Sequence, residues 1–95
     1  MKYSKANYDL MRFERSRRAN KKYDAVLRNI QTNREVRVPF GDNRYEQYKD
    51  NTGVGIYSHL DHNDLDRRRR YWERHRRDID MDNYTAGNFS LKYLW

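Results

Sequence analysis

The stretch from residue 57 to residue 80 constrains the fold most, because it holds all three histidines and seven of the arginines. Leu65, Trp72 and Ile79 recur there every seven residues, so they would form one narrow apolar seam along a helix whose other faces are charged. This spacing predicts a long Arg-rich helix over residues 63–79. Three large side chains cannot hold such a helix alone, so the seam must dock on another element.

The start of this helix carries residues that are typical of an N-terminal cap. Asn63 would accept from the first free backbone N–H groups, and Asp66 follows three residues later, as in a capping box. Asp64 and Asp66 fall in the first turn, where the helix dipole favours negative charge. The pattern therefore sets the start of the helix at residue 63.

Residues 21–40 show the two-residue period of β-strands on either side of a polar turn. The apolar positions of this alternation are Tyr23, Ala25, Leu27, Val36, Val38 and Phe40. Residues 31–33 supply turn chemistry between the two runs, which predicts a β-hairpin whose apolar residues belong to the core. Pro39 lacks the N–H group of a ladder bond, so it indicates an edge strand or the end of a strand.

Residues 1–20 are expected to form a basic arm or a short helix in front of a folded domain at 21–95. The first 40 residues hold eleven lysines and arginines against four acids, and the whole chain has a net charge of +7. The positive excess thus lies in the N-terminal 40 residues, where it would attract nucleic acid or an acidic protein surface. The cations expected to contact phosphate are Arg12, Arg15, Arg17, Arg18, Lys21 and Lys22.

The supply of core-forming residues is small. Leu, Ile, Val and Phe make up only 16 of the 95 residues, whereas there are nine tyrosines and two tryptophans. Tyrosine and tryptophan bury large areas and keep a polar tip, so they suit thin cores and wet interfaces. The composition predicts a marginal fold that gains stability from a partner, in an oligomeric context.

Several classes of protein are excluded by what the chain lacks. It has no cysteine, so it forms no disulfide and no thiolate metal site. No apolar run approaches the roughly 20 residues of a membrane span. The first 18 residues lack the apolar core of a signal peptide, so we expect a protein that is not secreted and that acts in an intracellular compartment or in a particle assembled there.

The histidines offer the ligand types of a metal site in the wrong arrangement. His59, Asp61 and His62 precede the predicted helix, and His75 lies near its end, roughly 18 Å from residue 63 along a helix. These groups cannot share one ion unless the preceding segment folds back, so we expect no metal and no cofactor. The serines stand in no nucleophile elbow, and the sequence therefore favours a protein that is not an enzyme.

The arginines of the helix give a candidate contact surface. Arg67, Arg70, Arg74 and Arg77 would share one face, with Tyr71 beside them. Such a row can follow a phosphate backbone or pair with a carboxylate-rich protein surface. The alternative is a solvated face, because six acids lie nearby in residues 61–80.

The C-terminal segment YTAGNFSLKYLW is unusually aromatic. Gly87 and Asn88 would start a short helix that holds Phe89 and Tyr93 on one side. A segment of this kind is rarely left in water, so we expect it to fold back over the hairpin or over the apolar seam. In the alternative, Tyr93 and Trp95 insert into a neighbouring subunit.

Three stretches of the chain resemble a family of small basic proteins encoded by large nucleocytoplasmic DNA viruses: VPFGDNRYEQYKD, IYSHLDHNDLDRRRRYWERH and YTAGNFSLKYLW. The residues that carry the resemblance are Phe40-Gly41, Tyr45, Tyr48, His59-Asp61-His62, Arg74-His75 and Leu94-Trp95. It covers about residues 22–95. The resemblance implies a large DNA virus or a related mobile element as the setting, where such proteins often serve as minor components of the particle.

The sequence thus predicts a small α+β domain in which a β-hairpin packs against the long Arg-rich helix, with a basic N-terminal arm and an aromatic C-terminal segment. The leading functional hypothesis is a non-enzymatic virion or assembly protein, a minor capsid or bridging subunit that docks on other virion proteins. Its predicted contacts are Arg67, Arg70, Tyr71, Arg74, Arg77, Tyr93 and Trp95. The alternatives are a nucleic-acid-binding or DNA-condensing protein and, third, a metal-dependent nuclease that uses His59, Asp61 and His62.

Overall fold

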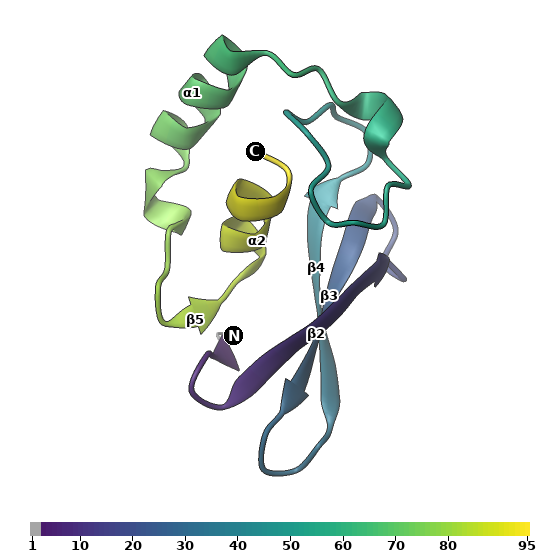
Figure 1. Cartoon of the computed structure of the whole chain (residues 1–95), viewed down its shortest axis with the longest axis vertical. Helices are drawn as coiled ribbons and strands as arrows, with labels where there is room; N and C mark the ends of the chain where they lie inside the picture. The colour runs from purple at the N-terminus through teal and green to yellow at the C-terminus, as the bar shows by residue number, and fades with distance from the viewer. Residues whose placement is uncertain (1–2) are drawn as a thin grey trace.

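A three-stranded antiparallel sheet forms the centre of the computed structural model, which describes residues 3–95 (Figure 1). Its strands are β2 (Tyr8–Arg15), β3 (Lys21–Asn29) and β4 (Glu35–Asp42), in the order β2-β3-β4. The predicted hairpin is confirmed, because β3 and β4 pair directly and the chain turns between them at the predicted polar residues. Pro39 lies in β4, which is an edge strand of this sheet.

The N-terminal residues belong to the sheet, so the prediction of a basic arm or short helix over residues 1–20 is wrong for the described part. Residues 8–15 form β2, which pairs with β3 and places Leu10 beside Leu27 and Phe13 beside Ala25. The register shifts between Leu10 and Arg12. This irregularity interrupts the two-residue period, so the strand had no clean alternation in the sequence.

One face of the sheet is covered by α2 (Ala86–Tyr93), which confirms the predicted C-terminal helix and its return over the hairpin. Thr85 caps this helix, since its Oγ1 accepts a hydrogen bond of 3.1 Å from the backbone N–H of Asn88. The ring of Phe89 stacks on Phe40 of β4 with centroids 5.4 Å apart. The buried core consists of Tyr23, Ala25, Leu27, Val38, Phe40, Phe89 and Leu94.

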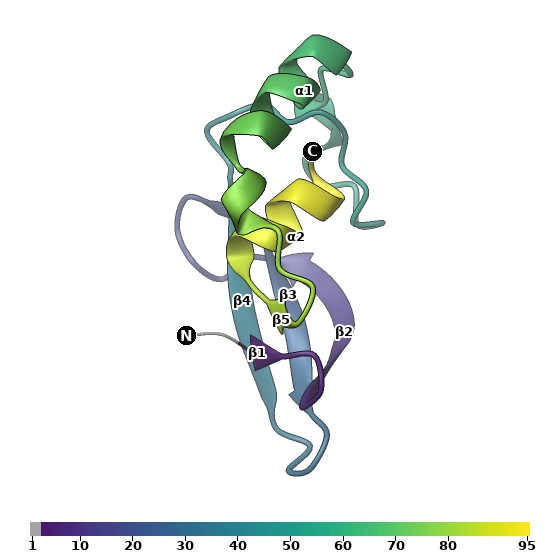
Figure 2. The same cartoon turned by 90° about the vertical axis from the view of Figure 1, so that its left-hand side faces the viewer.

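A two-stranded ribbon ties the first described residues to the segment that precedes α2. β1 (Tyr3–Ser4) pairs antiparallel with β5 (Asn83–Tyr84), and Tyr3 lies opposite Tyr84 (Figure 2). The ring of Tyr84 in turn stacks on Phe89 with centroids 5.7 Å apart. The ribbon therefore extends the aromatic core at the N-terminal end of α2.

The Arg-rich helix is shorter than predicted. α1 (Leu65–Arg74) has ten residues, and a separate 3-10 turn, η2 (Arg76–Asp78), follows it. The helix ends because the chain turns towards α2, where a Cβ atom on Gly87 would lie only 2.7 Å from Cγ of Asp78. No helix in residues 3–95 has the length and hydropathy of a membrane span.

The start of α1 also differs from the prediction. Asp64 is the N-cap, and its Oδ1 accepts from the backbone N–H groups of Asp66 at 2.9 Å and Arg67 at 3.2 Å. Asn63 has a φ of 54°, in the left-handed region, and precedes the cap. The predicted capping box from Asn63 to Asp66 is therefore wrong by one residue.

The predicted apolar seam is not buried. Leu65 is 66% exposed and Ile79 is 46% exposed, and α1 contains no buried residue. The helix instead directs Tyr71 towards the body of the protein, where this ring stacks on Trp95. The α+β class is confirmed, whereas the packing of a hairpin against a long helix through Leu65, Trp72 and Ile79 is wrong.

The core should therefore depend on Phe89 and not on the seam. Replacing Phe89 by Ala removes the ring that joins α2 to the sheet, and we expect the free energy of unfolding to fall by about 3–5 kcal/mol. Replacing the exposed Leu65 by Ala should change it by less than about 0.5 kcal/mol. Urea unfolding followed by circular dichroism measures both, and a larger loss for Leu65→Ala than for Phe89→Ala would contradict this packing.

Candidate functional site

A groove of about 600 Å³ lies between α1 and the rest of the protein. Figure 1 shows α1 on the outer side of α2, away from the sheet. The groove takes one wall from α1, another from the end of α2 and its floor from β3 and β4. Its lining residues are Lys22, Gly41, Asp42, Arg44, Tyr45, Glu46, Arg67, Arg70, Tyr71, Arg74, Ser90, Leu94 and Trp95.

Trp95 holds α1 in position beside the groove. Its ring lies parallel to that of Tyr71, with centroids 4.1 Å apart and an interplanar angle of 4°. Its backbone oxygen accepts a 2.7 Å hydrogen bond from Nε of Arg68. His75 stacks on Tyr71 at 4.1 Å, and His62 lies against Trp95 at 5.1 Å. These four rings form one aromatic column.

The side chains of the groove carry five cations and two carboxylates, so positive charge is in excess. Arg44 pairs with Asp42 at 2.7 Å, and this bond lowers the pKa of Asp42 well below its usual range. Arg67 pairs with Glu46 at 3.3 Å. Two cations are therefore neutralised by neighbours in the groove itself.

The other three cations, Lys22, Arg70 and Arg74, form no ion pair within residues 3–95. Lys22 is only 2% exposed, and burial lowers its pKa to about 8. The negative charges of Asp42 and Asp50, together with that of Asp61, oppose this shift without cancelling it. At neutral pH the Lys22 ammonium is therefore charged, carried by a nearly buried side chain and without an ion-pair partner within residues 3–95.

Gly41 allows the floor of the groove to close tightly. Its φ is +74°, which strains a residue with a side chain. A Cβ atom at this position would lie 2.8 Å from Cδ1 of Leu94 and 3.2 Å from Cβ and Cδ of Lys22. The absence of a side chain lets Leu94 and Lys22 approach each other over β4.

The structure brings together most of the residues predicted to bind a partner. Arg67, Arg70, Tyr71, Arg74 and Trp95 all line the groove. The two exceptions are Arg77 and Tyr93.

Arg77 and Tyr93 lie outside the groove. Arg77 is exposed in η2 beyond the end of α1. Tyr93 packs on Phe13 with ring centroids 4.6 Å apart and belongs to the edge of the core. Tyr93 thus stabilises its own chain.

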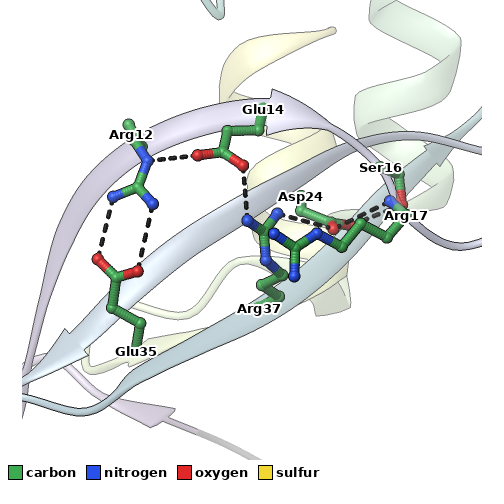
Figure 3. Close-up of polar contacts among 7 residues, drawn as sticks. All are labelled: Arg12, Glu14, Ser16, Arg17, Asp24, Glu35 and Arg37. Atoms are coloured by element: carbon green, nitrogen blue, oxygen red, sulfur yellow. Dashed lines mark hydrogen bonds and ion pairs between the residues drawn. The ribbon is translucent and has the colours of Figure 1, made fainter.

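The six cations predicted to contact nucleic acid do not share one surface. Arg12 donates to Glu35 at 3.0 and 3.2 Å in an ion network on the sheet face away from α2 (Figure 3). Arg37 extends this network to Glu14 at 2.6 Å, and its bond lowers the pKa of Glu14 to about 2. The network therefore stays ionised at neutral pH and neutralises this face.

The remaining members of that set are divided between a turn and the groove. Arg15 lies over the ring of Tyr57, 5.9 Å from its centroid. Arg17 and Arg18 are exposed in the turn between β2 and β3. Lys21 begins β3, and Lys22 lies on the groove floor.

The side chains of the weak metal-ligand candidates, His59, Asp61 and His62, do not share hydrogen-bond partners in the described part of the chain. Oδ1 of Asp61 accepts from Nε2 of Gln47 at 2.6 Å and from the backbone N–H of Asp50 at 2.9 Å. Nδ1 of His62 accepts from the backbone N–H of Asp64 at 2.9 Å, and His59 is exposed. Residues 3–95 contain no group of three or more His, Cys, Asp or Glu side chains that could hold a metal ion.

Comparison of the chain with protein-family models, curated proteins and solved structures found no match. The groove itself therefore carries the functional interpretation. Sequence reasoning missed Lys22 as a groove residue and assigned it to the cations expected to contact nucleic acid. The signal was present, since continuing the hairpin register from Ala25 and Val38 sets Lys22 opposite Gly41.

Lys22 should destabilise the fold at neutral pH. Between pH 8 and about 10.5 the unfolded chain binds more protons at this lysine than the folded chain, so its contribution to stability rises with pH in that window. Lys22→Met should therefore raise the free energy of unfolding by about 2–3 kcal/mol at pH 7, and this gain should shrink by about 2 kcal/mol at about pH 9.5.

Urea unfolding at the two pH values measures this difference, with Lys49→Met, an exposed lysine, as the matched control. The control should change stability by less than about 0.5 kcal/mol at either pH. A Lys22→Met gain that does not vary with pH would contradict the buried charge.

Trp95 should control the attachment of α1. Trp95→Ala removes the stack on Tyr71, and we expect the amide protection of residues 65–74 to fall about tenfold in hydrogen exchange. Met81→Ala, at a side chain that is 79% exposed, is the control and should leave the protection unchanged. Equal protection in the Trp95→Ala protein would show that other contacts hold the helix.

Proposed function

We propose that this protein is a non-enzymatic docking protein whose groove binds an acidic segment of a partner protein. The observation that carries the proposal is the set of three cations without ion-pair partners, Lys22, Arg70 and Arg74, on one groove. The rim residue Tyr45, which is 65% exposed, adds apolar contact surface beside these charges. This combination of cations and apolar surface suits a peptide that carries carboxylates between larger side chains.

A protein segment fits the groove better than a nucleic acid does. Single-stranded nucleic acids stack their bases on free aromatic faces. The parallel rings of Tyr71 and Trp95 cover each other, and His75 and His62 lie against them. Lys22 is buried in the floor, where a wide duplex backbone has no access. Tyr71 and Trp95 of the aromatic column thus form part of the groove wall.

The setting of the proposal is a viral particle or its assembly. It rests on the resemblance of residues 22–95 to small basic proteins of large DNA viruses and on the thin core of the chain. The partner would be another particle protein, and this protein would act as a minor capsid or bridging subunit. Anchoring by a few arginines and aromatic residues matches the way that protein interfaces concentrate their binding energy.

A second candidate function is supported by the turn between β2 and β3. Arg17 and Arg18 are exposed there, they form no ion pair within residues 3–95, and Lys21 follows them. Such a cationic tip would contact phosphates in a way that weakens steeply with salt. It contributes three cations at most, so we assign it weak and nonspecific nucleic-acid binding.

The two functions are separated by matched variants. We expect the double variant Arg70→Gln, Arg74→Gln to weaken binding of a fluorescent Glu-rich peptide at least tenfold, since charge-assisted bonds contribute about 1.5–3 kcal/mol each. Arg77→Gln, outside the groove, is the control and should change it by less than about twofold. Fluorescence anisotropy at two salt concentrations measures both.

The same proteins are then titrated with duplex DNA. The groove variant should bind DNA as the unmodified protein does, whereas Arg17→Gln, Arg18→Gln should weaken DNA binding alone. Tight DNA binding that is lost in the turn variant, together with no peptide binding by the unmodified protein, would establish the second function in place of the first.

A further inference from the structure

We propose that the groove floor contains a discrete carboxylate-binding site, formed by the ammonium group of Lys22 and the guanidinium groups of Arg70 and Arg74. The inference rests on the proposed function and deepens it, because the bound carboxylate is that of a Glu or Asp side chain in the docked segment. All three cations line the same groove, Lys22 from β3 and the two arginines from α1.

Lys22 is an unusual residue for its position. Buried lysines in folded proteins are normally paired, because an isolated buried charge costs several kcal/mol. Lys22 as a whole is 2% exposed and forms no ion pair within residues 3–95, but its Nζ is not among the buried polar atoms that lack a partner, so the ammonium group itself reaches solvent. The chain thus holds a cation on a nearly buried side chain, with its ammonium group accessible and without a direct ion pair in the described residues.

The nearby carboxylates of the chain are already engaged. Asp42 accepts from Nε and Nη2 of Arg44 at 3.0 and 2.7 Å. Asp50 accepts from the hydroxyl of Tyr23 and from that of Thr52.

Asp61, the third acid whose charge acts on Lys22, accepts from Gln47 and from the backbone of Asp50. None of the three acids forms an ion pair with Lys22 within residues 3–95. The three acids therefore act on Lys22 only at a distance, and its ammonium group is free to pair with a carboxylate from outside the chain.

The site has room for such a group. The absence of a side chain at Gly41 leaves the Lys22 methylenes in contact range of the β4 backbone. Tyr45, which is 65% exposed, lies in the same groove and offers an apolar surface to the methylene groups of a glutamate. A groove of about 600 Å³ accommodates one such side chain with its flanking backbone.

Binding at this site must be coupled to protonation of Lys22. A bound carboxylate favours the charged ammonium, so Lys22 takes up a proton when the segment binds at pH values near and above 8, and binding weakens as pH rises. The charged or titratable groups that act on this lysine or share its groove are Asp42, Arg44, Tyr45, Glu46, Asp50, Asp61, Arg67, Arg70, Tyr71 and Arg74. Burial raises the pKa of Tyr71, which keeps its hydroxyl neutral in this window.

The test is calorimetric titration of the Glu-rich peptide at about pH 8.5, in two buffers of different ionisation enthalpy. We expect the unmodified protein to take up roughly half a proton or more on binding. Lys22→Met should bind at least tenfold more weakly and take up no proton. Lys49→Met, at an exposed lysine, should behave as the unmodified protein does. Equal affinity and equal proton uptake in Lys22→Met would overturn the site.

A second measurement keeps this inference separate from the proposed function. The titration of Lys22 is followed by NMR of its side chain, in acetate and in chloride at equal ionic strength. We expect acetate to raise the titration midpoint of Lys22 and to leave that of Lys49 unchanged. A rise with acetate but no peptide binding would refute the docking function and retain the site, whereas an unchanged midpoint would refute the site.

Discussion

The stack of Phe89 on Phe40 is the contact on which the rest of the structure depends. It fixes α2 on the sheet, and α2 in turn carries Trp95 to the place where the ring meets Tyr71. Since α1 buries no residue of its own, this last contact decides where the helix lies. The groove thus exists because a chain poor in aliphatic residues joins its elements through aromatic pairs.

The net charge of a sequence stretch does not indicate where cations without ion pairs lie in the folded protein. Arg12 lies in β2 and Arg37 in β4, where Glu14, Glu35 and Asp24 neutralise them. The arginines of α1 lie in a segment that is nearly neutral overall, yet Arg70 and Arg74 face the groove without ion pairs. Folding therefore separates the cations into a neutralised face and a groove that holds cations unpaired within residues 3–95, and net charge alone does not locate the excess of positive charge.

The sequence allowed the hairpin and the C-terminal helix to be predicted, because their periods and turn residues are local signals. It did not reveal β2, since the irregularity after Leu10 breaks the alternation. It overestimated the Arg-rich helix, because the chain leaves α1 after Arg74 and brings Asp78 against Gly87 of α2, a tertiary contact that the local pattern does not encode. Five of the seven predicted contact residues line the groove. The burial of Lys22 could not be predicted, because it depends on where α2 lies against the sheet.

The order of the elements along the chain has a consequence for how the protein is made. Synthesis delivers β2, β3 and β4 first, so the apolar side chains of Tyr23, Val38 and Phe40 emerge before residues 86–94 exist to cover them. An uncovered sheet with β4 at its edge is the kind of surface that pairs with other chains. A nascent chain of this protein is therefore exposed to aggregation until α2 is complete. The longer this interval lasts, the more the chain should depend on chaperones.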